Sequence, residues 1–246
     1  MKLLEYLKHR CRAGRYKNKN YRGGIAYIKS AIKEGQTVFD IVSHKAAYIY
    51  FMRRKMWDKG KIVAFEQQEN LYLYISKINK LFRWNNVTVE HLALSDSEGE
   101  TTLFIPANKV SKASSPGATI VKSKFNSTQY TTESVSTETL DSYCKRNLFF
   151  PDFLKIDVEG NELKVLQGGI ETLKKCKPNI LIEIEARHVG QNTVLETFKF
   201  LESLGYMGYL LHGMEQIPLP DFSFDKYQNL NDRKNYCNNF VFEHIA

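Results

Sequence analysis

The amino-acid sequence predicts a doubly wound α/β fold, in which helices cover both faces of a mostly parallel sheet. Strand-like and helix-like segments alternate from residue 37 to residue 94, and after a break at residue 100 the alternation resumes at residue 153. The segment Phe153, Leu154, Ile156 and Val158 is almost continuously apolar. Such a run is typical of a strand buried on both faces of a parallel sheet.

The expected elements follow from apolar spacing and from the positions of Gly and Pro. Helices are expected over residues 3–7, 25–34, 46–57, 71–82, 140–145, 162–167 and 194–201. Strands are expected over residues 37–41, 61–66, 87–94, 101–105, 119–125, 130–136, 153–158, 179–185, 206–211 and 239–243. We expect a polar, basic link between the first two helices, and loops over residues 106–118 and 213–235. The second loop is long enough to be a lid or a binding loop, or else disordered.

The positive charge is concentrated at the N-terminus. The chain of 246 residues has a net charge of +8, and residues 1–35 alone carry ten Lys and Arg residues against two Glu residues. We therefore expect a basic helical arm over residues 1–34 and one α/β domain over residues 35–246. This domain would have an inserted β-rich segment at about 100–137 and a long loop at about 212–236. Such an arm can contact an anionic membrane, nucleic acid or a phosphorylated substrate, but basic surfaces are more often only solvated.

Cysteine spacing and hydropathy indicate the compartment. The four cysteines are far apart and have no metal-ligand spacing, which is typical of reduced thiols in an intracellular protein. Glu5 and Lys8 interrupt the N-terminus before any apolar stretch, so we expect no signal peptide. No apolar run approaches the ~20 residues that a membrane span needs. We expect a cytoplasmic protein without a resident metal.

Two carboxylates follow the first two strands of the expected sheet. Asp40 lies at the end of one strand and Glu66 at the end of the next, and a carboxylate at the second position can accept hydrogen bonds from both ribose hydroxyls. The chain has neither the GxGxxG motif of dinucleotide sites nor the GKS/T motif of nucleoside triphosphate sites. A nucleoside ligand without a phosphate fits better, and S-adenosylmethionine is the obvious one.

Further acidic residues follow two later strands. Open parallel sheets bind ligands at the carboxyl ends of their strands, so the side chains at these ends are candidates for a general base. The candidate catalytic residues are Asp157, Glu159, Glu185 and His188. The structural alternative for Asp157 and Glu159 is that they cap the helix that follows. Glu183 alternates with isoleucines in its strand, and we expect it to form an ion pair with a nearby Lys or Arg.

Several segments resemble one known family. VFDIVSHKA, IVAFEQQ, LALSD, ETLDSY, NILIEIE and above all FLKIDVEGNELKVLQGG are similar to motifs of the FkbM family of S-adenosylmethionine-dependent methyltransferases, from about residue 35 to residue 242. The resemblance implies a class I methyltransferase fold, which is Rossmann-like and has a seven-stranded sheet with an antiparallel last strand. It also implies cofactor contacts: the turn from Asp40 to Ala46 would wrap the methionine part, and Glu66 would hold the ribose. Ala93 to Asp96 would line the adenine, and Asp157 would lie near the sulfonium and the acceptor. The implied cofactor-binding residues are Asp40, Val42, Ser43, His44, Glu66, Ala93, Leu94, Ser95, Asp96 and Asp157.

One motif departs from the family pattern. The first motif of the family resembles Asp-Ile-Gly-Ala-Asn-x-Gly, whereas this chain has Val42 and Ala46 in place of the glycines and His44 in place of the asparagine. Glycine in such a turn permits positive φ angles or a close approach of the ligand to the backbone, and a β-branched residue at positive φ is an outlier. Either the turn has rearranged around Val42, or the affinity for the cofactor is weakened or lost.

Three functions are consistent with these features. The first is an O-methyltransferase that acts on a hydroxyl of a small molecule or sugar, with the acceptor class implied by the resemblance. The second is a non-catalytic binding or scaffold protein of the same fold, which the loss of both glycines suggests. The third is an RNA methyltransferase that uses the basic arm. We rank it last and expect no nucleic-acid partner, because the interleaved aromatic residues of a base-stacking groove are not evident.

Overall fold

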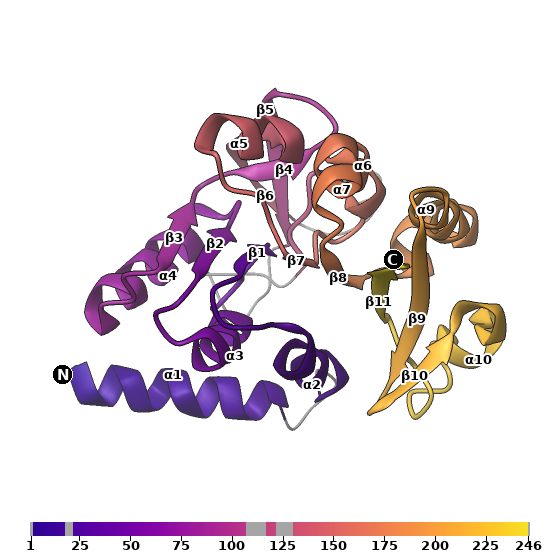
Figure 1. Ribbon diagram of the computed structural model, residues 1–246, viewed down its shortest axis with the longest axis horizontal. Coiled ribbons are helices and arrows are strands. Elements are labelled where there is room, and N and C mark those ends of the chain that lie inside the picture. Colours follow the sequence, from indigo (N-terminus) through magenta and orange to yellow (C-terminus); the bar gives the residue numbers. More distant parts are fainter. Residues whose placement is uncertain (1, 18–21, 107–116, 122–129, 246) are drawn as a thin grey trace.

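The computed structural model describes residues 2–17, 22–106, 117–121 and 130–245. An eight-stranded sheet with the strand order β10-β9-β11-β8-β7-β1-β2-β3 forms its centre (Figure 1). The strands of this sheet are β1 (Thr37–Ile41), β2 (Lys61–Phe65), β3 (Val87–Glu90), β7 (Phe153–Ile156), β8 (Asn179–Glu183), β9 (Tyr206–His212), β10 (Glu215–Pro218) and β11 (Asn239–His244).

The strand directions confirm the expected class I methyltransferase arrangement. Strands β3, β2, β1, β7 and β8 pair in parallel, and β11 is antiparallel to both β8 and β9. The expected count of seven strands is exceeded by one, because β10 pairs with the edge strand β9. This additional strand lies in the segment 213–235, which we expected to be a loop. The same segment also contains a 3-10 helix (Leu219–Asp221) and α10 (Phe224–Tyr227).

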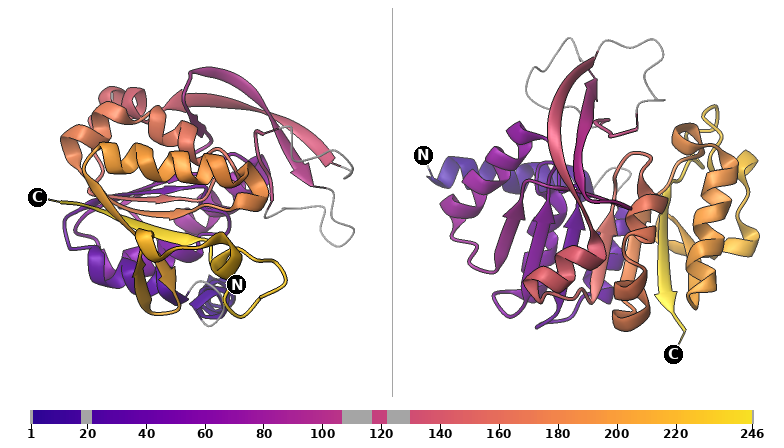
Figure 2. Two further views of the ribbon diagram at one scale, coloured as in Figure 1. Left: turned by 90° about the vertical axis from the view of Figure 1, so that its right-hand side faces the viewer. Right: turned by 90° about the horizontal axis from the view of Figure 1, so that it is seen from above.

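Helices cover both faces of the sheet (Figures 1 and 2). One face carries α1 (Lys2–Lys17), α2 (Arg22–Ala31), α3 (Ala47–Met56) and α4 (Glu69–Phe82). The other carries α5 (Leu140–Asn147), α6 (Glu162–Gln167), α7 (Ile170–Cys176) and α9 (Gln191–Ser203). The short helix α8 (Ala186–Val189) follows β8. In the part of the chain that the structure describes, no helix is both long and apolar enough to cross a membrane.

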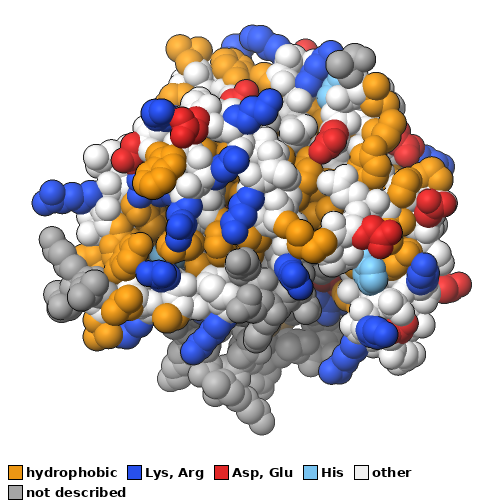
Figure 3. Space-filling model, turned by 60° about the horizontal axis from the view of Figure 1, so that its bottom comes forward, with side chains coloured by type: hydrophobic (Ala, Val, Ile, Leu, Met, Phe, Trp, Pro, Cys, Tyr) orange, Lys and Arg blue, Asp and Glu red, His pale blue; other side chains and the backbone are white. Residues whose placement is uncertain are grey.

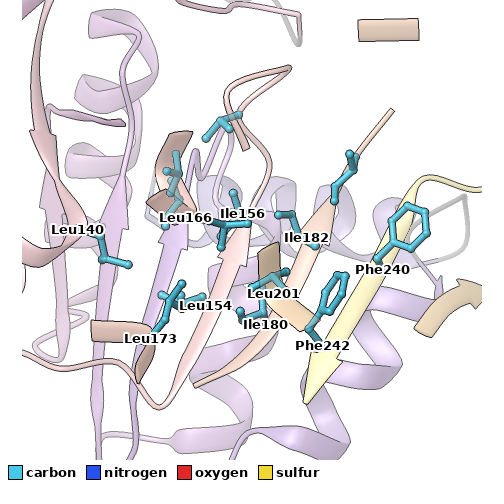
Figure 4. Close-up of a cluster of buried hydrophobic side chains, with 14 of the residues drawn as sticks. Leu140, Leu154, Ile156, Leu166, Leu173, Ile180, Ile182, Leu201, Phe240 and Phe242 are labelled. Carbon is cyan, nitrogen blue, oxygen red and sulfur yellow. The ribbon is translucent and has the colours of Figure 1, made fainter. Parts of the chain in front are cut away.

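The alternation of side chains along each strand divides the hydrophobic core into two layers. Leu154 and Ile156 of β7 and Ile180 and Ile182 of β8 contribute to the layer beneath α5, α6, α7 and α9 (Figure 4). Phe153, the first residue of β7, belongs to the layer beneath α1 to α4. Lys155 and Asp157 follow Phe153 at spacings of two residues, so the polar end of β7 is expected on this second face.

A small three-stranded sheet projects from the main one (Figure 2). It contains β4 (Ala93–Ser95), β5 (Gly99–Pro106) and β6 (Tyr130–Thr139), with β6 in the middle. The single strand expected over residues 87–94 is therefore wrong: it is divided into β3 and β4, because β4 leaves the main sheet to pair with β6. The strand expected over 119–125 is described only in part, as an isolated bridge between Phe104 and Thr119, and most of the loop expected over 106–118 lies outside the described residues.

Two helical predictions were incomplete. The helix α1 continues to Lys17, far beyond the expected end at residue 7, because its inner face packs on the body: His9 and Ala13 are buried, and Arg12 donates a hydrogen bond to Tyr74. The helix expected over 162–167 ends as predicted, but a second helix, α7, begins at Ile170 directly after the two glycines.

Candidate active site

The turn after β1 has an alternating backbone conformation. The φ angles of Val42, His44 and Ala46 are 62°, 49° and 60°, so every second residue is left-handed. These are the three positions at which the family pattern has Gly, Asn and Gly, the residues that tolerate this conformation best. The turn therefore has a left-handed residue at each position where the family pattern has Gly or Asn. It retains a glycine-like path at a cost of ~1–3 kcal/mol for each residue held there.

Hydrogen bonds hold this turn in place. The backbone N–H of Ser43 donates to the carbonyl of Phe65 over 3.0 Å, and its hydroxyl donates to the carbonyl of Asp40 over 2.9 Å. The N–H of His44 donates to Oε2 of Glu66 over 2.8 Å. The turn is thereby fixed to the ends of both β1 and β2.

Lys155 connects three parts of the site. Its Nζ lies 3.3 Å from Oδ1 of Asp40 and 3.4 Å from Oδ2 of Asp157, and it donates to the carbonyl of Val42 over 2.7 Å. Asp40 and Lys155 are register partners on neighbouring strands. We call Lys155, Asp40 and Asp157 the lysine cluster. Burial opposes the charge of Lys155, but the two carboxylates outweigh this effect and raise its pKa.

The two carboxylates expected to hold the cofactor are fully buried. Burial raises the pKa of Asp40, although Lys155 acts in the opposite direction. Burial also raises the pKa of Glu66 to about 8, against the hydrogen bonds that its oxygens accept from the N–H groups of Gln68 and His44. Both residues lie where the sequence predicted, at the ends of β1 and β2.

Four carboxylates lie at the ends of β7 and β8: Asp157, Glu159, Glu183 and Glu185. We call them the acidic cluster. Burial raises the pKa of Glu183 well above its usual value, and the other three carboxylates add to this effect. Burial would also raise the pKa of Glu185, but hydrogen bonds from Arg187, Tyr236 and Asn238 lower it to about 2. Glu183 and Glu185 are neighbours, but the pKa of the first is raised and the pKa of the second is lowered.

Glu183 is the functional candidate that the sequence did not indicate. Its Oε1 accepts a hydrogen bond from the Asn238 amide over 2.6 Å, and among the described residues it has no ion-pair partner, so the expected ion pair is wrong. In the sequence, the alternation with Ile182 and Ile184 puts Glu183 and Glu185 on one face of the strand, and this pattern could have indicated Glu183 as a site residue. The proton affinity was not predictable, since Asn238, Asp157 and Glu159 come from distant segments of the chain.

A narrow cavity with no free volume for a water molecule brings the two clusters together. Its lining residues are Tyr48, Lys155, Ile156, Asp157, Leu181, Glu183 and Asn239. His188, in α8, lies at the margin of the acidic cluster, with Nδ1 3.3 Å from Oε2 of Glu159. The cavity therefore brings together a buried cation, Lys155, a carboxylate that this cation holds, Asp157, and a carboxylate with a raised pKa, Glu183.

The residues that the resemblance assigns to the adenine, Ala93 to Asp96, lie in β4 and directly after it. Ala93 and Leu94 are strand residues of β4 whose side chains pack into hydrophobic clusters. The amide of Asn161 donates to the carbonyl of Leu94 and to Oγ of Ser95, both over 3.3 Å. Asp96 pairs with Lys164 of α6 over 3.4 Å. Leu94, Ser95 and Asp96 thus contact the start of α6, whereas Lys155 contacts Asp40, Asp157 and the carbonyl of Val42.

The cysteines and the acidic groups do not form a metal site within the described chain. All four cysteines are free, and Cys144 and Cys237 are buried. No group of three or more His, Cys, Asp and Glu side chains among the described residues is arranged to hold a metal ion.

Comparison with known proteins identifies the family. The model of the methyltransferase FkbM domain matches residues 40–207. The chain belongs to this family. The match covers the turn, the lysine cluster and the acidic cluster, and the predicted relationship is confirmed. No curated protein matches the chain at a significant level.

Solved structures share the fold of this FkbM-family chain at low identity. An FkbM methyltransferase from Methylobacillus flagellatus KT is 14% identical with a TM-score of 0.57, and the match covers 86% of this chain and 44% of that one. An rRNA methylase from Streptococcus thermophilus is 12% identical with a TM-score of 0.50, and the match covers 93% and 98%. Aeropyrum pernix fibrillarin, in complex with natively bound S-adenosyl-L-methionine, is 10% identical with a TM-score of 0.50, and the match covers 89% and 73%. This chain therefore spans less than half the length of the FkbM structure.

Proposed function

We propose that this FkbM-family chain is an S-adenosylmethionine-dependent methyltransferase that methylates a hydroxyl group of a small molecule or sugar. The observation that carries the proposal is the turn after β1, which keeps left-handed backbone at Val42, His44 and Ala46 although no glycine is present. A chain that had abandoned the cofactor would have no need to retain this strained path. Lys155 holds the same turn through the carbonyl of Val42.

The polar groups around the turn fit the cofactor. Apart from the ion contact with Lys155, the carboxylate oxygens of Asp40 have no hydrogen-bond donor among the described residues, so they retain acceptor capacity. Each oxygen of Glu66 accepts one backbone N–H, and a carboxylate oxygen can accept another bond, here from a ribose hydroxyl. Asp40, the turn and Glu66 would hold the methionine and ribose parts. When bound, the cofactor supplies a methyl group that its sulfonium has already activated.

The space at the site is tight. The cavity has no free volume for a water molecule, whereas small-molecule sites typically have ~300–1,000 Å³. We therefore expect side chains around the turn to move when the cofactor binds. Val42, which is bulkier than the glycine of the family pattern, is the first candidate.

Glu183 is the proposed general base. Burial and the neighbouring carboxylates raise its pKa, which makes its ionised form a stronger proton acceptor, and its side chain lines the cavity beside Asp157. An acceptor hydroxyl in the cavity would pass its proton to Glu183. Asp157, held by Lys155, would orient the acceptor, and Glu159 with His188 would border it. Glu185 is assigned an anchoring role, because its donors keep it ionised.

A second candidate function is a non-catalytic protein of the same fold. Val42 narrows the turn at the position of a family glycine, and the small cavity is consistent with a closed site. This candidate predicts that the native chain does not bind the cofactor.

A thermal-shift titration with S-adenosylmethionine and S-adenosylhomocysteine tests the two candidates. At 100 times Kd, binding adds ~2.7 kcal/mol of stability, which for this size is roughly 5–10 °C. We expect a saturable shift in the native chain and tighter binding in Val42→Gly. Val42→Ala is the matched control, since it removes volume but keeps a Cβ at positive φ.

The outcomes separate the candidates. A shift only in Val42→Gly would favour the non-catalytic protein, and no shift in either would overturn the methyltransferase. With an acceptor in hand, Glu183→Gln should lower kcat by ~10²–10⁴-fold and leave the thermal shift unchanged.

A further inference from the structure

We propose that a basic groove between α1, α2 and α3 binds a phosphate-bearing anion. The groove has a volume of about 550 Å³ and lies on the face of the molecule shown in Figure 3, where Lys and Arg side chains are common. Its described lining residues are Arg10 and Gly14 of α1, Lys29 of α2, and Tyr50, Phe51, Arg54 and Lys55 of α3. Four of these are cationic, and none is acidic.

Aromatic side chains position two of the cations. Arg54 donates to the hydroxyl of Tyr50 over 3.3 Å and lies 5.9 Å from the centre of its ring. Nζ of Lys29 lies 5.3 Å from the centre of the Phe51 ring. The two rings are in edge-to-face contact with each other and form a rigid base. A cation that is held in place loses less side-chain freedom when it binds an anion.

The charge of the groove indicates its ligand. Arg54, Lys55, Arg10 and Lys29 are exposed side chains of like charge around one concave surface. Such a surface raises the local positive potential and attracts anions. Arginine matches phosphate oxygens with paired N–H groups, and lysine binds phosphate as a point charge. A ligand with more than one phosphate charge would contact cations from several helices at once.

The aromatic residues favour phosphate itself over a nucleobase. Tyr50 and Phe51 are only 7% and 6% exposed, so their ring faces are not available for base stacking. Leu4 and Leu7, which lie on the same helix as Arg10, are 57% and 44% exposed, so apolar side chains that can contact a lipid lie on the same helix. The phosphate can therefore come from a free phosphorylated molecule or from a lipid headgroup, and the experiment below distinguishes the two.

The groove is separate from the candidate active site. Tyr48, in the first turn of α3, lies with its ring 5.4 Å from Nζ of Lys155, whereas Arg54 and Lys55 are in the last turn. Seven residues of helix between Tyr48 and Lys55 span ~10 Å. The inference therefore does not depend on methyl transfer.

Calorimetric titration of the full chain with inorganic pyrophosphate tests the proposal. The variant Arg54→Gln/Lys55→Gln removes two groove charges, and Lys77→Gln/Lys80→Gln removes two exposed charges from α4 as the matched control. We expect Kd to rise roughly 5- to 30-fold in the groove variant and less than about twofold in the control. Arg10→Gln, on a different helix, should also weaken binding, and raised salt should weaken it in the native chain.

Parallel assays with vesicles and RNA identify the source of the phosphate. Saturable pyrophosphate binding that the groove variant loses supports a free phosphorylated ligand. Binding only to phosphatidylglycerol vesicles, and not to phosphatidylcholine vesicles, with the same loss supports a lipid headgroup. The proposal is overturned if neither probe binds, if both double variants lose binding equally, or if only single-stranded RNA binds.

Discussion

Lys155 in β7 and His9 in α1 are both buried, with 4% and 1% of their surfaces exposed, but their surroundings differ. Lys155 lies between the carboxylates of Asp40 and Asp157. The ring of His9 lies among the rings of Tyr50, Phe82 and Trp84. Neither of its nitrogens has a hydrogen-bond partner among the described residues.

The two residues show how burial selects the protonation state. Carboxylate partners outweigh the burial of Lys155 and raise its pKa, so the lysine keeps its charge. Burial, with a smaller effect from Arg12, lowers the pKa of His9 to about 4, so the histidine is neutral. A buried charge therefore marks the place where the fold has assembled partners around it, which is also the place where chemistry is expected.

The largest expected effect is that of removing the charge of Lys155. Lys155→Met leaves Asp40 and Asp157 without their cation, and breaking a buried ion pair in this way costs ~3–5 kcal/mol. Urea unfolding measures the loss, and adding Asp40→Asn should recover part of it. The control is Arg146→Gln, which removes an exposed partner of Glu138 and should cost less than ~1 kcal/mol. If the two variants lose the same stability, the buried ion pairs of Lys155 contribute no more than the exposed pair of Arg146 and Glu138, and the comparison fails.

The sequence predicted the strands and the edge of the sheet that carry the site. Alternating segments were sufficient for β1, β2, β7, β8 and β11, because each is a local apolar pattern. Asp40, Glu66, Asp157 and Glu185 lie at the strand ends where they were expected. The strand β10 and the break between β3 and β4 were missed because both depend on pairing with strands elsewhere in the chain.

The electrostatics of the site could not be predicted from the sequence. Glu183 and Glu185 are two residues apart in one strand, yet the pKa of one is raised and that of the other is lowered. The difference comes from Arg187, Tyr236 and Asn238, two of which lie about fifty residues away in the chain. The burial of His9 could not be predicted either, since the helix expected over residues 3–7 ends before His9, whereas α1 continues to Lys17 and packs His9 on the body.

A smaller effect is expected at His9. His9→Phe replaces an unpartnered buried ring with an apolar one and should raise the free energy of unfolding by ~1–3 kcal/mol at neutral pH. The folded pKa of about 4 lies below the ordinary value of 6.5, so the unfolded state binds more protons between these values. The stability of the native chain therefore falls as pH is lowered through this window, by ~3 kcal/mol in total.

The pH dependence provides the check on His9. The difference in stability between His9→Phe and the native chain should grow as pH falls from 6.5 to 4, as measured by urea unfolding at several pH values. Part of the acid sensitivity should remain in the variant, because burial also lowers the pKa of His44 to about 4. A difference that does not change with pH would mean that His9 has a partner or is exposed.

The smallest expected effect concerns the backbone beside Lys155. Ala46 is fully buried and has a φ of 60°, a conformation that costs an L-residue ~1–2 kcal/mol. Ala46→Gly relieves this cost but adds ~0.5–1 kcal/mol of conformational entropy to the unfolded chain. A net gain of ~0.5–1 kcal/mol should raise Tm by a few degrees.

The neighbouring residue provides a control of opposite sign. Ala47 begins α3 and is not among the residues with positive φ, so Ala47→Gly should destabilise the chain by ~0.5–1 kcal/mol. The two substitutions delete the same methyl group from adjacent positions, and they differ only in backbone conformation. If both lower Tm, the left-handed turn does not persist in solution, and the main support for cofactor binding is lost. If their effects have opposite sign, the turn keeps its glycine-like path at the site where Lys155 holds its charge.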